Sequence, residues 1–283
     1  MVTLKNKNLT VEINPRGAEL SSVTGADGFA YLWQGDPAVW AGRAPVLFPI
    51  VGGLRDDVFY YDGKSYHLPK HGFARTSDFT VETLRENSAV FLLRSSDSTK
   101  QSYPFDFAFR VGFRLCENRL AIEYRVDNTD DREIYFSFGA HEAYACAGGI
   151  EGYQLEFPAP ETLSRLMVDG NLLNGKAVPV IENSRFLPLK NRYFEDDALI
   201  FKSIASKQVT LTGFPGARRV TVDYPGFAQL LIWTKPGAEY ICIEPWDGIP
   251  DSVGCKQDIT KKEGIVVLQP GKTYALTHTV TFQ

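Results

Sequence analysis

The sequence of 283 residues lacks most of the motifs that mark specialised classes of enzyme. It has only four cysteines, and none of them form the C-x-x-C spacing of structural zinc sites and thioredoxin-like redox pairs. It also contains no glycine-rich nucleotide-binding loop, no G-x-S-x-G motif and no H-x-H or H-E-x-x-H metal motif. These absences argue against a nucleotide-dependent enzyme, a serine hydrolase and a zinc enzyme of the common types.

The sequence also has no excess of positive charge and no long apolar run. Lys and Arg number 30 and Asp and Glu number 34, so the net charge of −4 offers neither nucleic acid nor anionic lipid a basic surface. The longest apolar stretches, such as residues 44–51, are too short to span a membrane. Residues 1–8 lack the apolar core of a signal peptide. We therefore expect a cytoplasmic protein without a nucleic-acid or membrane partner.

Helical periodicity is scarce, whereas the 19 Phe, 13 Tyr, 24 Gly and 16 Pro suit strands and turns. Apolar residues alternate with more polar ones at 105–113, 120–126 and 274–282, which predicts half-buried strands. The Asp62-Gly63 pair predicts a hairpin over 59–66, because both residues tolerate the positive φ of a type I′ turn. We expect further strands at 9–14, 79–84, 88–94, 133–139, 206–212, 218–224 and 228–234, and one short helical turn at 98–103.

Closely spaced strands without intervening helices predict an all-β fold, either a β-sandwich or a barrel. No repeat or linker divides the chain, so we expect one domain over residues 1–283. The stretch 158–192 is rich in Pro, Gly and Asn, and we expect it to form long surface loops.

The sequence has only four histidines, which we weigh one by one. His67 lies in the second arm of the predicted hairpin and is expected to be exposed, and His278 is expected in the core. His71 and His141 each stand where a predicted strand leaves the sheet. Titratable groups on loops held by a rigid sheet are common in functional sites, so these two are candidates. Glu142 is adjacent to His141 but points elsewhere on an extended backbone, and we interpret it as structural.

The third candidate is Glu244, which we place at the end of an apolar strand, directly before Pro245 and Trp246. A carboxylate under an indole is partly desolvated, which raises its pKa and its strength as a base. The alternative is a carboxylate that anchors the loop 245–252. Two histidines and one glutamate suit either an acid–base set or a metal site. We favour the acid–base set, with no metal, because no H-x-H motif occurs.

At these residues the sequence resembles the aldose 1-epimerase (galactose mutarotase-like) family, and within it the LacX-like bacterial branch. The resemblance runs nearly end to end, through segments 9–21, 44–52, 62–63, 71–75, 139–144, 197–201 and 242–246. It implies a large twisted antiparallel β-sandwich. It also implies an isomerase that interconverts the α and β anomers of a free aldose and needs no cofactor.

The resemblance assigns roles to four residues. Glu244 matches the catalytic base and His141 the catalytic acid. His71 matches a histidine that contacts the sugar near its ring oxygen, and Asp197 matches an aspartate that holds sugar hydroxyls. We expect a small-molecule sugar as the partner, and either a monomer or a homodimer.

One position departs from the family pattern. Family members usually carry Arg where this sequence has Gly53, and we expect Arg55 or Arg75 to supply the missing guanidinium. Among the many aromatic residues, Trp246 and Phe73 are our choices for the platform under the apolar face of a sugar.

Three alternatives stay open at this point. A hexose-6-phosphate 1-epimerase would use Arg43, Arg55 and Arg75 to hold the phosphate. A non-catalytic carbohydrate-binding or sensor protein would keep the fold without the reaction. A metal-dependent sugar enzyme is the third alternative.

Overall fold

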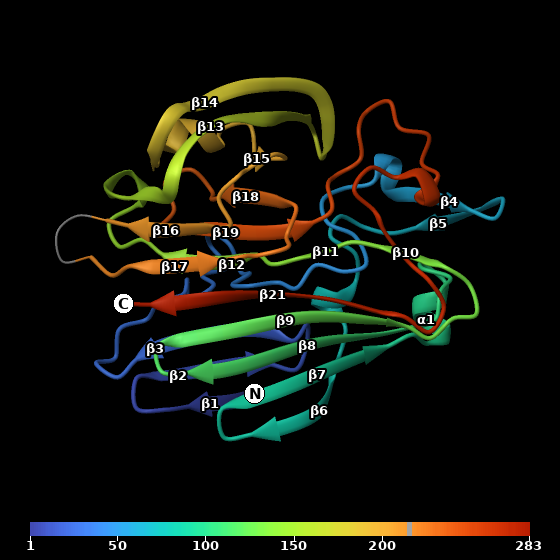
Figure 1. Ribbon diagram of the computed structural model, residues 1–283, viewed down its shortest axis with the longest axis horizontal. Helices are drawn as coiled ribbons and strands as arrows, with labels where there is room; N and C mark the ends of the chain where they lie inside the picture. The colour runs from blue at the N-terminus through green and yellow to red at the C-terminus, as the bar shows by residue number, and fades with distance from the viewer. Residues whose placement is uncertain (214–216) are drawn as a thin grey trace.

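The chain is built almost entirely of antiparallel strands, and the computed structural model describes residues 1–213 and 217–283 (Figure 1). The largest sheet has 14 strands. Its continuous path runs in the order β11 (Phe138–Gly139), β19 (Tyr240–Asp247), β18 (Gln229–Trp233), β15 (Leu199–Phe201), β13 (Gln154–Asp169), β16 (Gln208–Thr212), β17 (Val220–Asp223), β21 (Thr273–Phe282), β9 (Arg119–Asn128), β8 (Phe107–Cys116), β7 (Ser88–Arg94), β6 (Thr80–Arg85). Off this path, β12 (Glu142–Ala145) pairs with β19, and β14 (Leu172–Pro188) pairs with β13.

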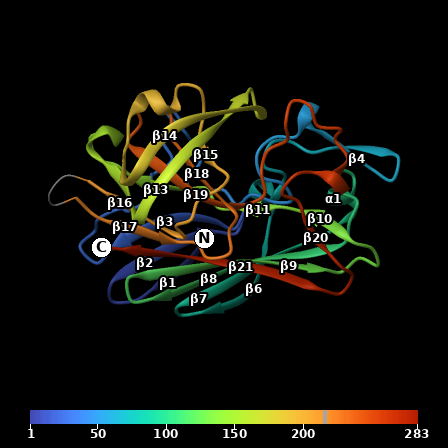
Figure 2. The same ribbon diagram turned by 45° about the horizontal axis from the view of Figure 1, so that its top comes forward.

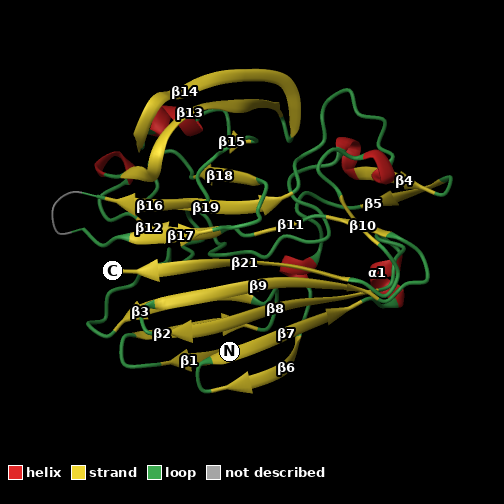
Figure 3. Ribbon diagram, in the orientation of Figure 1, coloured by secondary structure: helices red, strands yellow, loops and turns green. Residues whose placement is uncertain are grey.

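Three smaller sheets complete the strands of the described residues. They are β1 (Val2–Lys5) with β2 (Leu9–Asn14) and β3 (Glu19–Gly25), β4 (Val58–Tyr61) with β5 (Lys64–His67), and β10 (Ile134–Phe136) with β20 (Val266–Leu268). Helix is confined to single turns (Figure 3), namely α1 (Asp97–Lys100) and the 3₁₀ turns η1 (Arg55–Asp57), η2 (Ala74–Thr76), η3 (Ile150–Gly152), η4 (Asn191–Phe194) and η5 (Ile259–Lys261). None of the helices in the described residues has the length and apolar character that crossing a membrane requires.

The main apolar core includes buried side chains of the β1–β3 sheet and of the β7–β9 part of the large sheet, which Figures 1 and 2 place against each other. Alternate residues of β2, such as Val11 and Ile13, are buried, and so are Phe109 and Val111 of β8. These side chains belong to one apolar cluster. The fold is thus an all-β sandwich, which is one of the two alternatives that the strand pattern left open and the one that the family resemblance implies.

The predicted strands are largely confirmed, with one division. The hairpin over 59–66 forms as β4 and β5, and both Asp62 and Gly63 have positive φ, as a type I′ turn requires. The stretch 133–139 does not form one strand. It divides at Ser137 into β10 and β11, which join different sheets.

The expectation of surface loops over 158–192 is wrong. Much of this stretch forms a long hairpin of β13 and β14, which arches over β15 and β18 in Figure 1. Register shifts interrupt the pairing, including one between Glu156 and Glu161 that spans Pro158 and Pro160. Bulges and an outer strand such as β14 accommodate prolines, because their missing N–H groups are not needed for a central ladder.

Candidate active site

The strand register brings His141 opposite Glu244. In the pairing of β11 with β19, Gly139 lies opposite Trp246, and in the pairing of β12 with β19, Glu142 lies opposite Ile243. The same antiparallel register runs through the short break between β11 and β12, so His141 and Glu244 are a cross-strand pair on one face. Glu244 therefore lies inside β19 and not at the end of a strand as we expected from the sequence.

The two side chains are close and almost fully buried. His141 Nδ1 lies 3.4 Å from Glu244 Oε1, with side-chain exposures of 11% and 2%. The Nδ1 atom has no hydrogen-bond partner in the described structure. Burial lowers the pKa of His141 to about 3 and raises the pKa of Glu244 well above its usual value. The pair is thus an imidazole and a carboxyl whose uncharged forms are favoured.

Trp40 covers the imidazole ring of His141. Its indole stacks on the imidazole with ring centroids 5.3 Å apart and an interplanar angle of 29°. The loop that carries Trp40 is fixed by two hydrogen bonds, from Trp33 Nε1 to the Trp40 carbonyl (2.8 Å) and from the Trp40 N–H to the Asp36 carbonyl (2.7 Å). This packing contributes to the desolvation that lowers the pKa of His141.

His71 is held by the backbone of Gly52. The His71 N–H donates to the Gly52 carbonyl (2.8 Å), and the Gly52 N–H donates to His71 Nδ1 (3.1 Å). Burial lowers the pKa of His71 well below its usual value, so the ring is neutral. Because Nδ1 accepts a hydrogen bond, the ring proton lies on Nε2 and is available as a donor.

The glycine beside His71 is required by the close approach of another segment. Gly72 has φ of +68°, and a Cβ at this position would lie 2.3 Å from the Phe48 carbonyl oxygen. The His-Gly pair therefore has two parts. The imidazole of His71 is fixed by a hydrogen bond, and Gly72 allows the Phe48 carbonyl to approach more closely than any side chain would permit.

These groups line one cavity of about 330 Å³, within the range of small-molecule sites. Its walls also carry indoles, cations, an aspartate and an amide. The lining residues of this kind are Trp40, Trp233, Trp246, Lys70, Arg75, Lys235, Asp197 and Asn171. A concave site with aromatic walls and convergent polar groups suits a sugar, which has an apolar ring face and polar edges.

Comparison with known proteins agrees with this geometry. The model of the family described as "Aldose 1-epimerase" matches residues 1–281. The chain belongs to the aldose 1-epimerase family. It is 31% identical to "Protein LacX, chromosomal" of Lactococcus lactis over 99% of this chain and 98% of that protein.

A solved structure is similar over nearly its whole length. The "galactose mutarotase related enzyme" of Lactobacillus acidophilus superimposes with a TM-score of 0.93 at 33% identity, covering 99% of this chain and 96% of that one. A "Putative glucose-6-phosphate 1-epimerase" of Escherichia coli matches a shorter part, with 31% identity over 35% of this chain and 33% of that protein.

Six of the eight site residues expected of this epimerase family member meet at the cavity: His71, Arg75, His141, Asp197, Glu244 and Trp246. Trp246 is buried, and its indole N–H donates to the Ala140 carbonyl (3.0 Å) beside His141. Asp197 precedes β15, and its Oδ1 accepts a hydrogen bond from the Ala198 N–H (2.8 Å). Their roles toward a substrate stay predictions.

The structure does not bring Arg55 or Phe73 to this cavity, whose described lining contains neither. The Arg55 guanidinium lies 3.6 Å from Asp56 and donates to the Cys255 carbonyl. Phe73 packs its ring against Phe48 and other aromatic rings of the core. Of the two arginines expected to supply the missing guanidinium, only Arg75 lines the cavity, and its role stays a prediction.

Asn171 occupies the space beside Gly53. A Cβ on Gly53 would lie 2.8 Å from the Asn171 Cβ. Asn171 is in the turn of the β13–β14 hairpin, so the tip of this hairpin fills the space beside Gly53.

Sequence reasoning missed several lining residues. Lys70 lies directly before His71 in the sequence, but of this motif only His71, Phe73 and Arg75 are expected at the site. Trp40 and Asn171 lie in a loop and a turn, where no periodic pattern indicates a direction for the side chain. Trp233 could have been found, because it lies in the predicted strand 228–234, and this strand pairs with the strand of Glu244.

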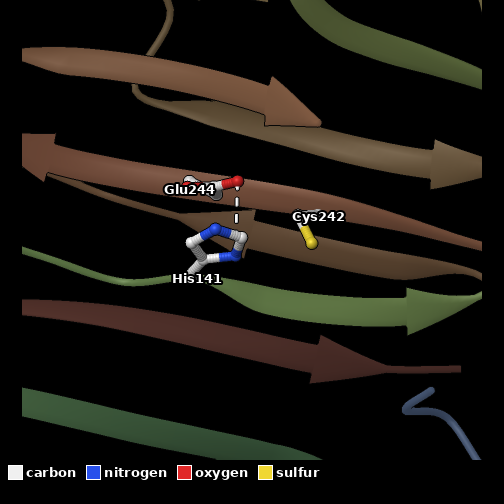
Figure 4. A group of neighbouring side chains, drawn as sticks. All are labelled: His141, Cys242 and Glu244. Atoms are coloured by element: carbon white, nitrogen blue, oxygen red, sulfur yellow. Dashed lines mark ion pairs between the residues drawn. The ribbon is translucent and has the colours of Figure 1, made fainter. Parts of the chain in front are cut away.

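Cys242 is a further neighbour that the sequence could have revealed. It precedes Glu244 by two positions in β19, and residues two apart on a strand share a face. Possible ligand atoms of His141, Cys242 and Glu244 lie within 4.8 Å of one another (Figure 4). Among the described residues, these three side chains form a group that could hold a metal ion.

The remaining histidines agree with the sequence analysis. His67 is exposed on β5. His278 of β21 is fully buried, and its Nε2 lies 3.1 Å from Oε1 of Glu142, which is also buried. Glu142 thus points to the opposite face of β12 from the cavity, as expected for a structural residue.

Proposed function

We propose that the protein is an aldose 1-epimerase that interconverts the α and β anomers of a free aldose. The observation that carries this proposal is the His141–Glu244 pair at the wall of a cavity lined with indoles and polar groups. Mutarotation needs an acid and a base acting on one hemiacetal, and no redox change or activated group. The proposed enzyme therefore requires no cofactor.

In the proposed reaction, Glu244 takes the proton of the anomeric hydroxyl while His141 donates a proton to the ring oxygen. The bond between C1 and the ring oxygen breaks, and a carbonyl forms at C1. Rotation about the C1–C2 bond presents the other face of the carbonyl. On closure His141 takes back the proton of the hydroxyl, and Glu244 returns a proton to the carbonyl oxygen, so the protein ends in its starting state.

Burial of the pair favours the ring-opening step. Before ring opening, Glu244 is a carboxylate and His141 is protonated. After ring opening, both groups are neutral. The pair therefore holds the same number of protons before and after the step. Because the pKa of His141 is lowered and that of Glu244 is raised, the neutral pair is the stable arrangement. Transfer of one proton between groups 3.4 Å apart gives the reactive form, and ring opening restores the neutral one.

The other cavity residues supply binding contacts in this proposal. His71 Nε2–H is a fixed donor for a sugar oxygen, and Asp197 is an acceptor for sugar hydroxyls. Trp40 and Trp233 line the cavity beside His141, where an indole can cover the apolar face of a pyranose.

Polarimetry of freshly dissolved α-glucose and α-galactose tests the proposal. We expect the protein to speed the approach to anomeric equilibrium. The variants Glu244→Gln and His141→Asn should each lose about 10²–10⁴-fold of that acceleration, because each removes one proton-transfer group. Rates that stay unchanged in both variants would exclude the acid–base assignment. Sugar binding without any acceleration would favour a non-catalytic binding or sensor protein.

A hexose-6-phosphate 1-epimerase is the second candidate, and the cations of the cavity favour it. Lys70, Arg75 and Lys235 line the cavity, and within the described residues none of them forms an ion pair with a carboxylate. Arg43, one of the three arginines expected to hold the phosphate, instead donates to the Ser21 carbonyl. Rates with glucose and glucose 6-phosphate, measured for the wild type and for Lys70→Met, distinguish the two candidates. A phosphate preference that Lys70→Met weakens would support the second.

A further inference from the structure

We propose that His141, Glu244 and Cys242 form a binding site for a soft divalent cation such as Zn²⁺, which inhibits the enzyme reversibly. The ion would bind His141 Nδ1, a Glu244 oxygen and the Cys242 sulfur. The inhibition rests on the proposed epimerase function, whereas the binding of the ion does not.

The β-sheet places the three side chains as a triangle on one face. Ala143 lies opposite Cys242 in the same register that puts His141 opposite Glu244, so Cys242 is the diagonal neighbour of His141. Figure 4 shows His141 and Glu244 facing each other, with the Cys242 side chain beside them.

The distances are close to those of a tetrahedral zinc site. With Zn–N and Zn–O near 2.0–2.2 Å and Zn–S near 2.3 Å, neighbouring ligand atoms lie about 3.3–3.6 Å apart. His141 Nδ1 and Glu244 Oε1 are already 3.4 Å apart, and the whole triangle fits within 4.8 Å.

A second observation points independently to a ligand here. His141 Nδ1 is fully buried and has no hydrogen-bond partner among the described residues, although buried ring nitrogens normally have one. A metal ion would satisfy this atom. Since Nδ1 must then be unprotonated, the proton of the neutral ring would move to Nε2.

Charge and access also suit the ion. Binding Zn²⁺ releases the thiol proton of Cys242 and the carboxyl proton of Glu244 to solvent, which leaves a thiolate and a carboxylate that balance the two positive charges. His141 and Glu244 line the cavity, so the fourth zinc ligand would be a water on that side. A thiolate ligand favours Zn²⁺, Cd²⁺ and Co²⁺ over Mg²⁺ and Ca²⁺.

This site blocks catalysis because the ion takes both proton-transfer groups. A cation on His141 and Glu244 prevents either group from exchanging a proton with the sugar. Cys242 itself is absent from the described lining of the cavity, so we place it outside the catalytic and sugar-binding machinery.

The test uses the full chain, first freed of metal with a chelator. Co²⁺ is titrated while the near-ultraviolet absorption is followed, because a thiolate ligand gives a charge-transfer band. Zn²⁺ is titrated in a calorimeter and in the mutarotation assay, with Mg²⁺ as the hard-cation control. The matched variants are Cys242→Ala and Cys146→Ala, both at fully buried cysteines.

We expect one Co²⁺ per chain with a thiolate band, and inhibition by Zn²⁺ that the chelator reverses. Cys242→Ala should lose the band, keep the metal-free rate and need at least about 10–100-fold more Zn²⁺ for inhibition, since even indirect supporters of a metal site contribute this much. Cys146→Ala should behave as the wild type. A band that persists in Cys242→Ala, or equal Zn²⁺ inhibition in both variants, would overturn the proposal. Metal binding in a protein that has no epimerase activity would refute the proposed function alone.

Discussion

The described residues contain two buried histidine–carboxylate pairs, one on each face of the β12–β19 strand pair. His141 and Glu244 lie 3.4 Å apart at the cavity, and His278 and Glu142 lie 3.1 Å apart in the sandwich core. Each imidazole also stacks on an aromatic ring, His141 on Trp40 and His278 on Tyr124.

The decisive difference between the pairs is access. The side chain of His141 is 11% exposed and lines a cavity, whereas that of His278 is 0% exposed. Similar chemical groups therefore serve two purposes. The cavity pair can exchange protons with a bound molecule, and the core pair can only contribute to packing and to the satisfaction of buried polar groups.

The same substitution on the two faces should affect the mutarotation rate differently. Glu244→Gln removes the proposed base and should lower the mutarotation rate about 10²–10⁴-fold with the fold retained. Glu142→Gln should keep most of the rate per folded molecule, because Glu142 has no access to the cavity. Polarimetry with circular dichroism measures both effects. An equal loss of rate in both variants would contradict the division of roles.

Breaking the core pair should chiefly lower stability. His278→Leu leaves Glu142 buried without its partner, and removal of one member of a buried pair costs about 3–5 kcal/mol. Urea unfolding measures this change. The double variant with Glu142→Leu should recover part of the loss, because no buried carboxylate then remains unpaired. A single variant as stable as the wild type would show that the pair contributes nothing to the fold.

His141 and Glu244 should each make the stability of the fold depend on pH, and the two dependences should have opposite signs. The folded pKa of His141 is lowered from 6.5 to about 3, so on acidification the unfolded chain takes up a proton that the folded one does not, and stability falls below about pH 6.5. The folded pKa of Glu244 is raised above 4.5, so its contribution is fully present below about pH 4.5 and is lost as pH rises through the folded pKa.

Single variants separate these two contributions, each of which reaches at most about 1.4 kcal/mol per pH unit. Relative to the wild type, Glu244→Gln should lose more stability on acidification from pH 6.5 toward pH 4.5. His141→Asn should shift the dependence in the other direction. Urea unfolding at several pH values measures the slopes. Parallel curves for the wild type and both variants would refute the assigned directions.

The smallest expected effect concerns the ring that covers His141. Trp40→Ala should expose the imidazole to water and move its pKa upward by about one unit, because desolvation is the main cause of the lowered value. Trp40→Phe keeps an aromatic cover and should leave the pKa nearly unchanged. Titration of the histidine ring signals by NMR measures both. An unchanged pKa in Trp40→Ala would show that Trp40 does not govern the solvation of His141.

Much of the fold could be predicted, because half-buried strands produce a strict period of two. Residues 120–126 form the middle of β9, and 274–282 nearly all of β21. The β13–β14 hairpin could not be predicted in this way, since its prolines resemble loop signals and only the neighbouring strands show that they lie at bulges.

The candidate site shows the same limit. His71, His141 and Glu244 could be found because they follow or interrupt apolar strands in recognisable motifs. Trp40 could not, because a loop residue reaches its place through the tertiary fold alone. Cys242 was within reach, since the period of two that directs Glu244 toward the cavity face directs it there as well.

The tip of the β13–β14 hairpin has a consequence for engineering. It contributes Val168 and Asn171 to the cavity, while Glu244 stands on β19 and His141 directly before β12. The Leu173 N–H anchors the tip to the Asp251 carbonyl (2.8 Å). Libraries that vary the length and sequence of this one turn would therefore sample new sugar preferences without altering the proton-transfer groups, much as antibody loops are diversified on a constant framework.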